Sequence, residues 1–233
     1  MRVVALIPAF NEAETIVQTL TAVADLQLVD EIVVIDDGST DDTFVLASGC
    51  SLGKKVTVLR LKANRGKGGA LNYGRLNASG DAYLLLDADL GPTAILAGAL
   101  LEPILTEEAD MTIAHLGTKQ SSSSRKMGFG IVRRTASLGV RLLTGHEVLN
   151  PLSGQRVMTA EVLEAVGDFF EGFGVEVALT VGALHHGFRL TEIPLAMKHR
   201  ALGRGLGGLW HRGRQFIQVL SALWHCWRRG WHL

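Results

Sequence analysis

Residues 82–89 read Ala-Tyr-Leu-Leu-Leu-Asp-Ala-Asp, an apolar run that ends in two aspartates separated by one residue. Such a run is typical of a strand buried on both faces, and the aspartates follow where the strand reaches the edge of its sheet. Residues two apart in an extended segment face the same side, so we expect Asp87 and Asp89 to reach one hard cation. Mg²⁺ and Mn²⁺ favour carboxylate oxygens and commonly bridge to substrate phosphates. An isolated Asp-x-Asp also occurs at solvated strand ends, so the surrounding chain must decide.

The chain around this segment alternates strand-like and helix-like stretches. Strands are expected at 3–7, 31–35, 56–61, 82–86 and 111–115, with helices between them, including one at 94–105 and one capped by Asn11. Alternation with short connections predicts an α/β fold, with a mostly parallel central sheet and helices on both faces.

The pattern changes after residue 115. A polar link at 119–124 leads to an expected basic amphipathic helix at 125–143, and shorter elements follow at 154–157, 160–166, 175–184 and 189–193. The last expected strand stops at Pro194. We therefore divide the chain into a domain over 1–198, with halves 1–115 and 116–198, and a tail over 199–233.

Composition excludes several classes of protein. The chain has 233 residues, 47% hydrophobic and 20% charged, which excludes a wholly disordered chain. Two cysteines cannot form a disulfide framework or a zinc cluster, and a reduced, cytoplasmic setting fits them. No uncharged stretch approaches the roughly 18 apolar residues of a membrane-spanning helix.

The balanced net charge conceals an asymmetry. All 23 acidic residues lie at or before Glu192, whereas the 41 residues after it carry seven basic groups and no acidic ones. A basic tail on an acidic body predicts an anionic partner at that end of the chain.

Polar residues gather where the expected parallel strands end, which is the edge at which α/β sheets bind ligands. The residues concerned are Pro8, Asn11 and Glu12 after the first strand, Asp36 and Asp37 after the second, Asn64, Arg65, Gly66, Lys67 and Gly68 after the third, and Asp87 and Asp89 after the fourth. The glycine-rich turn can present backbone N–H groups and an ammonium to phosphate. It matches neither a Walker loop nor a dinucleotide-binding fingerprint, and a tight turn with a solvated lysine is the alternative.

Together these segments resemble the family 2 glycosyltransferases, which use nucleotide-diphosphate sugars and have a GT-A fold. The matching segments are Pro8-Ala9-Phe10-Asn11-Glu12, Val34-Ile35-Asp36-Asp37-Gly38-Ser39-Thr40-Asp41, Asn64-Arg65-Gly66-Lys67-Gly68-Gly69-Ala70 and Leu86-Asp87-Ala88-Asp89. Weaker similarity continues through Leu152-Ser153-Gly154-Gln155-Arg156, Gly174-Val175-Glu176 and His199-Arg200.

The resemblance implies a role for each of these positions. The nucleotide-sugar site would comprise Pro8, Ala9, Asn11, Glu12, Asp36, Asp37, Gly66, Lys67, Asp87 and Ala88. A magnesium or manganese ion (Mg²⁺ or Mn²⁺) on the diphosphate would be held by Asp87 and Asp89, with His199 as a third ligand. We expect Arg156, Arg200 and Arg204 to grip acceptor or donor phosphates. Asp89, Glu176 and Arg156 are the expected catalytic residues, with Glu176 as base if the acceptor is a hydroxyl.

The chain resembles two subfamilies that use different acceptors. Polyprenyl-phosphate sugar transferases share the Asp-Ala-Asp-Leu sequence and the Ser-Gly-x-Arg element, although Gly91 stands where many of them carry a metal-binding Gln. Glucosyl-phosphoglycerate synthases look similar around Pro151-Leu152-Ser153-Gly154 and Phe173-Gly174-Val175-Glu176-Val177, and their late metal-binding His would correspond to His199. The alternative for His199 is an ordinary surface histidine in a basic loop.

The tail favours the first subfamily. Its four Trp residues, Trp210, Trp224, Trp227 and Trp231, are spaced for one helix face, and most of its arginines fall elsewhere. Such an amphipathic helix suits a membrane interface, while docking on the core or a homodimer interface is the alternative.

We therefore expect a metal-dependent, inverting hexosyltransferase that uses a UDP- or GDP-linked sugar and a phosphate-bearing acceptor, a membrane-associated polyprenyl phosphate. Its location would be cytoplasmic, peripheral on the inner face of the plasma membrane, with no nucleic-acid partner. The alternatives are a soluble glucosyl-3-phosphoglycerate synthase-like transferase and, more distantly, a nucleotidyltransferase or a non-catalytic sugar-nucleotide-binding module. A nucleotidyltransferase would place its glycine-rich loop directly after the first strand, where this chain has Pro8-Ala9-Phe10.

Overall fold

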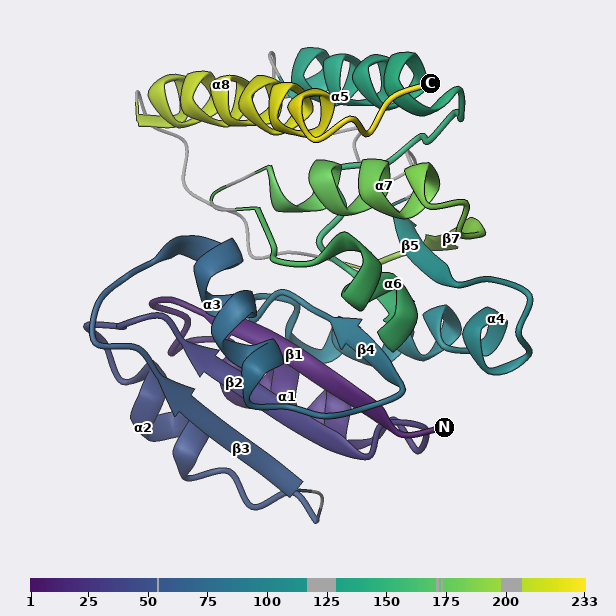
Figure 1. Cartoon of the computed structure of the whole chain (residues 1–233). Coiled ribbons are helices and arrows are strands. Elements are labelled where there is room, and N and C mark those ends of the chain that lie inside the picture. Colours follow the sequence, from purple (N-terminus) through teal and green to yellow (C-terminus); the bar gives the residue numbers. More distant parts are fainter. Residues whose placement is uncertain (54, 117–128, 171, 173, 198–206) are drawn as a thin grey trace.

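The computed structural model describes residues 1–53, 55–116, 129–170, 172, 174–197 and 207–233 (Figure 1). In chain order its elements are β1 (Val3–Ala9), α1 (Ile16–Ala24), β2 (Glu31–Asp36), α2 (Thr43–Ser48), β3 (Lys55–Arg60), α3 (Gly66–Leu76), β4 (Ala82–Leu85), the 3-10 helix η1 (Gly91–Leu100), α4 (Glu102–Leu105), β5 (Met111–Leu116), α5 (Phe129–Thr144), β6 (Arg156–Thr159), α6 (Ala160–Val166), α7 (Val175–His185), β7 (Leu190–Leu195) and α8 (Gly207–Arg228).

The strands form one seven-stranded sheet in the order β3-β2-β1-β4-β6-β5-β7. Strands β1 to β4 are parallel to one another, and β7 is parallel to β5. Strand β6 is antiparallel to both of its neighbours, β4 and β5. The predicted α/β fold with a mostly parallel sheet is therefore confirmed, and β1, β2 and β4 bring their carboxyl ends to one edge.

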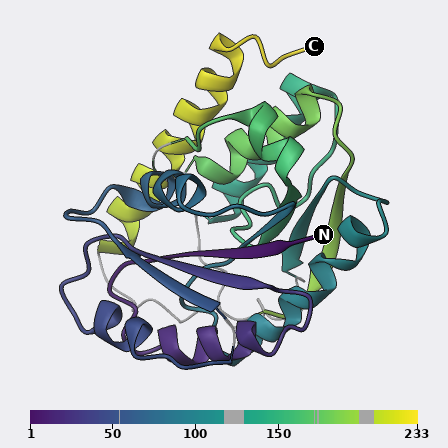
Figure 2. The ribbon, with the colours of Figure 1, turned by 60° about the horizontal axis from the view of Figure 1, so that its bottom comes forward.

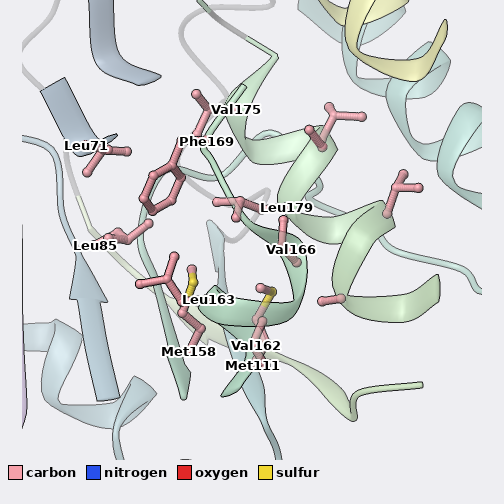
Figure 3. Packing of buried hydrophobic residues seen from close by; sticks show 14 of the residues in the cluster. Leu71, Leu85, Met111, Met158, Val162, Leu163, Val166, Phe169, Val175 and Leu179 are labelled. Atoms are coloured by element: carbon pink, nitrogen blue, oxygen red, sulfur yellow. The ribbon is translucent and has the colours of Figure 1, made fainter. Parts of the chain in front are cut away.

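Each face of the sheet has its own hydrophobic core, because successive side chains of a strand point to opposite faces. In β1, Val4 and Leu6 belong to a cluster with residues of α3, α6 and α7, whereas Val3 and Ile7 belong to another with residues of α1 and η1. Figure 2 shows the sheet between α1 and α2 on one side and the helices of the second half of the chain on the other. In the first cluster, residues from α3, β4, α6 and α7 interdigitate (Figure 3).

Two elements differ from their sequence predictions. The helix expected at 94–105 is a 3-10 helix followed by the single turn α4. Pro194 does not end the last strand but lies within β7. Strand β7 is at the edge of the sheet, the position at which strands tolerate proline.

Helices α5, α7 and α8 pack against one another over one face of the sheet (Figure 1). Helix α8 is attached through Val219, Ala222 and Cys226, which are buried in the same cluster as α7. Core docking, one of the alternatives for the tail, is thus confirmed for this side of α8. No helix among the described residues combines the length and the hydropathy needed to cross a membrane. The domain boundaries stay a prediction, and β5 runs through the one at residue 115.

Candidate active site

The loops after β1 and β2 are hydrogen-bonded to each other where the two strands end. The register places Ala9 beside Asp36, and the backbone N–H of Asp37 donates to the Ala9 carbonyl at 2.8 Å. Further on, the backbone N–H of Glu12 donates to Thr43 Oγ1 of α2 at 2.8 Å. The structure therefore joins the predicted residue Ala9 to Asp36 and Asp37, and ties the segment of Glu12 to α2.

Asn11 does not cap a helix, so that prediction is wrong. Helix α1 begins at Ile16, and Asn11 has a φ of 57°, in the left-handed region that asparagine tolerates. Its backbone N–H donates to Ser39 Oγ at 3.0 Å, and its Oδ1 accepts from the Thr40 N–H at 2.9 Å. Asn11 thus joins the two loops, and Pro8 precedes them inside β1, paired with Ile35.

The two aspartates at the end of β2 have different surroundings. Asp36 is fully buried, with Oδ2 3.1 Å from Arg60 Nε, and its Oδ1 accepts from the Ser39 N–H. Asp37 accepts the backbone N–H of Arg65 at 2.7 Å, directly before α3 begins. Burial raises the pKa of Asp37, and the backbone hydrogen bonds to it offset only part of this effect. Asp36 is therefore tied to Arg60 of β3, and Asp37 holds the start of α3 against β2.

The centre of the site is a cluster of charged and amide groups from four separate segments. Lys67 Nζ of α3 lies 2.6 Å from Asp87 Oδ1 and 2.8 Å from Glu176 Oε1 at the start of α7. Gln155 Nε2 donates to the other Asp87 oxygen, Oδ2, at 2.6 Å. Burial lowers the pKa of Lys67, but the charges of Asp87 and Glu176 outweigh it, and the pKa lies above its ordinary value. The lysine is therefore a fixed cation between two carboxylates.

Gly154 leaves the space that this cluster occupies. A Cβ at this position would lie 2.5 Å from Lys67 Nζ and 2.6 Å from Asp87 Oδ2. Any larger residue here would force the ends of the Lys67 and Asp87 side chains to move. This gives a physical reason for the glycine in the Ser153-Gly154-Gln155-Arg156 segment.

Arg156 is placed differently from its prediction as a phosphate ligand. Its side chain is fully buried in β6, where it donates to the carbonyls of Ser153 and Glu176 at 3.2 and 3.1 Å. Burial lowers the pKa of Arg156 to about 10, so it stays charged at neutral pH. Because its guanidinium has no exposed surface, Arg156 is better suited to position the cluster than to contact a ligand.

Asp87 and Asp89 do not lie in an extended segment, so the premise that strand alternation aligns them is wrong. Strand β4 ends at Leu85, and residues 88 and 89 form a turn. The buried Ala88 is fixed through its carbonyl, which accepts from Thr19 Oγ1 of α1 at 2.8 Å. Asp89 is half-buried at the turn.

The side chains at this edge include carboxylates that suit a divalent cation. Within the described residues, no three Asp, Glu, His or Cys side chains come together as a metal site. Mg²⁺ usually takes one or two carboxylates and completes its shell with water and substrate phosphates. Asp87 and Asp89 fit that pattern, and the Lys67 ammonium shows that Asp87 is already built to face a positive charge.

Some predicted residues cannot be placed, and one important residue was not predicted. His199, Arg200 and Arg204 lie outside the described residues. Gly66 begins α3 with a φ of 74°. Gln155 donates a hydrogen bond to Asp87, but it was not predicted as a site residue from the sequence. Its position next to Arg156 in the Ser-Gly-x-Arg segment could have indicated this role.

The fold and the site together define a class. The family model "Glycosyl transferase family 2" matches residues 4–166, and the chain belongs to that family.

Among its relatives is the glucosyl-3-phosphoglycerate synthase of Mycobacterium tuberculosis, 32% identical over 191 residues, which are 75% of this chain and 58% of the relative. The chain thus spans less than two thirds of that relative. The undecaprenyl-phosphate mannosyltransferase of Micrococcus luteus is 29% identical over 214 residues, 87% of this chain and 86% of the relative. A crystal structure of the mycobacterial synthase with Mn²⁺, UDP-glucose and phosphoglyceric acid has a TM-score of 0.74 and 29% identity, covering 95% of this chain and 79% of that one.

Proposed function

We propose that the chain is a metal-dependent, inverting glycosyltransferase that moves a hexose from a nucleotide-diphosphate sugar to a phosphate-bearing acceptor. The observation that carries this proposal is the Lys67–Asp87–Glu176 cluster at the edge where β1, β2 and β4 end. Ligands of open α/β sheets bind at this edge. Relatives that bind UDP-glucose with Mn²⁺ support the donor and the metal.

The residues of the site suit the electrostatics of this reaction. Cleavage of a sugar–diphosphate bond leaves negative charge on the departing phosphate, and fixed positive groups lower that barrier. Asp87 and Asp89 would hold Mg²⁺ or Mn²⁺, which supplies charge stabilisation to the leaving diphosphate when bound. Lys67 adds a fixed ammonium, and Asp37, Glu12 and the loop around Asn11 would line the nucleoside end.

The geometry around Glu176 favours an acceptor that arrives already ionised. Its carboxylate lies 2.8 Å from the Lys67 ammonium. This ion pair occupies the carboxylate, and a hydroxyl acceptor needs a free base whereas a phosphate does not. We therefore favour a polyprenyl phosphate, with the chain peripheral on the inner face of the plasma membrane.

A donor screen tests the core of the proposal. UDP- and GDP-sugars are incubated with the protein and Mn²⁺, or with EDTA, and release of nucleoside diphosphate is measured. We expect release that needs Mn²⁺ and rises when a short-chain polyprenyl phosphate is added. Absence of metal-dependent binding or turnover with every donor would contradict the assignment.

Phosphoglycerate is the second candidate acceptor, because the mycobacterial relative carries phosphoglyceric acid in its structure. Transfer to its hydroxyl would require Glu176 as base. Glu176→Gln therefore discriminates: it should abolish transfer to phosphoglycerate but leave transfer to a polyprenyl phosphate within about tenfold. The exposed Glu164→Gln on α6 is the matched control.

A further inference from the structure

Helix α5 presents an apolar stripe to solvent. Ile131, Leu138 and Leu142 are exposed and share one side of the helix. Val132, Ala136 and Val140 form the opposite, buried side. An amphipathic helix in a globular protein normally turns its apolar stripe inward, so a second, outward stripe needs a partner.

Helix α8 has the same two-sided character. Val219, Ala222 and Cys226 are buried, while Ile217, Leu220, Trp224 and Trp227 are exposed on the other side. The two Trp side chains are 57% and 56% exposed. Trp231, predicted to share this stripe, is buried because the chain reverses at Gly230, where φ is 78°, and the Trp231 N–H returns to the Cys226 carbonyl. The side chains of residues 207–214 lie outside the description.

The two stripes belong to one surface. Helices α5 and α8 contact each other and both contact α7 (Figure 1). A Cβ on Gly139 would meet the Leu223 side chain, so the helices are closely packed. Because each helix buries its inner side against the core, the exposed residues of both point away from the body. We call these seven exposed residues, Ile131, Leu138, Leu142, Ile217, Leu220, Trp224 and Trp227, the outer apolar surface.

The two helices that form the outer apolar surface carry basic side chains, and an acidic residue, Glu147, follows α5 and pairs with Arg141 at 2.9 Å. Neither α5 nor α8 contains an acidic residue. Arg134 of α5 and Arg228 of α8 are exposed beside this surface, and Arg228 stacks on Trp224 at 4.9 Å. Arg229 instead turns to the core, where it donates to the Val166 carbonyl. Exposed Trp and Leu flanked by arginines are the composition of a helix that lies in the interface of an anionic bilayer.

The outer apolar surface is connected to the candidate site through α7. A Cβ on Gly174 would lie 2.5 Å from the Ala222 side chain of α8. Gly174 directly precedes α7, which begins with Val175 and Glu176. The helix that bears the exposed Trp residues therefore packs against the segment that positions Glu176.

We propose that the outer apolar surface of α5 and α8 binds a bilayer rich in anionic lipid and so holds the candidate site beside a membrane-bound acceptor. The inference rests on the proposed function for its acceptor. The contact is not confined to the tail, because α5 contributes three of the seven residues of the outer apolar surface. Binding combines burial of Trp and Leu in the headgroup region with attraction of arginines to lipid charge.

Vesicle flotation of the 233-residue chain tests the inference. The vesicles contain either phosphatidylglycerol with phosphatidylcholine or phosphatidylcholine alone. The variants are Trp224→Ser with Trp227→Ser on α8, and Leu138→Ser with Leu142→Ser on α5. The control is Ile95→Ser with Leu96→Ser, two exposed apolar residues of η1 on the other side of the sheet. Thermal unfolding confirms that each variant is folded.

We expect flotation with anionic vesicles only, weakened by added salt, and reduced at least about tenfold by either helix pair but not by the control. Metal-dependent donor hydrolysis should be unchanged in both helix variants, which separates this result from failure of the proposed function. Three results would overturn the inference: no flotation of the wild type, equal binding to neutral vesicles, or loss of a homodimer in the Trp variant without any lipid effect.

Discussion

Replacing Lys67 by methionine removes the cation from the centre of the candidate site. The ammonium lies 2.6 Å from Asp87 and 2.8 Å from Glu176, and the three side chains are 24%, 27% and 10% exposed. Removing one partner of a well-buried ion pair costs about 3–5 kcal/mol, whereas exposed pairs contribute about 0.2–1 kcal/mol. For this partly buried bridge we expect a loss of about 3 kcal/mol, or a Tm lower by roughly 6–12 °C.

Urea unfolding at neutral pH measures this loss, with the exposed Lys62→Met as the matched control, expected within about 0.5 kcal/mol of the wild type. Mn²⁺ should stabilise Lys67→Met more than the wild type, because a ligand that binds only the folded state raises its stability and no ammonium then competes for Asp87. A loss below about 1 kcal/mol would refute the assignment of Lys67 as the central cation. Equal stabilisation by Mn²⁺ would refute the inference that metal and ammonium share Asp87.

Two further changes probe the walls of the site. Asp37→Asn should gain stability relative to the wild type as the pH rises above about 4, because a carboxylate with a raised folded pKa costs the folded state once it ionises. Urea unfolding at several pH values checks this, and a difference that does not change with pH would contradict it. Gly154→Ala should cost about 1–3 kcal/mol and weaken Mn²⁺-dependent donor binding, since its Cβ would lie 2.6 Å from Asp87 Oδ2. The control is Gly130→Ala, which has open space around it in α5 and should raise the free energy of unfolding by up to about 1 kcal/mol. Wild-type stability and donor binding in Gly154→Ala would contradict the prediction.

Local patterns in the sequence were enough to predict the sheet and the edge that carries the site. Apolar runs such as 3–7 and 31–35 form parallel strands β1 and β2, because a strand covered by helices on both faces must be apolar on both. The polar residues after these strands lie at one edge of the sheet, because parallel strands end on the same side. The family resemblance was carried by these segments, and the family match over residues 4–166 confirms it.

The contacts within the site were decided by the tertiary structure. Glu176 is 109 residues from Lys67 in sequence, and no local pattern indicates that the two form an ion pair. Gln155 meets Asp87 only because β6 pairs antiparallel with β4. The turn at 88–89 and the left-handed Asn11 depend on partners in α1 and in the loop after β2, which compete with the local preference for strand or helix.

In the tail, too, the sequence predicted the helix face and the tertiary structure decided which side chains are buried. The spacing of its Trp residues indicated one helix face, but the fold buries Trp231 and leaves Trp224 and Trp227 in solvent. Periodicity defines which side chains share a side of a helix, whereas packing against α5 and α7 determines which side is covered. Hydrophobic burial is a property of the assembled chain, since it depends on the area that distant segments remove from water.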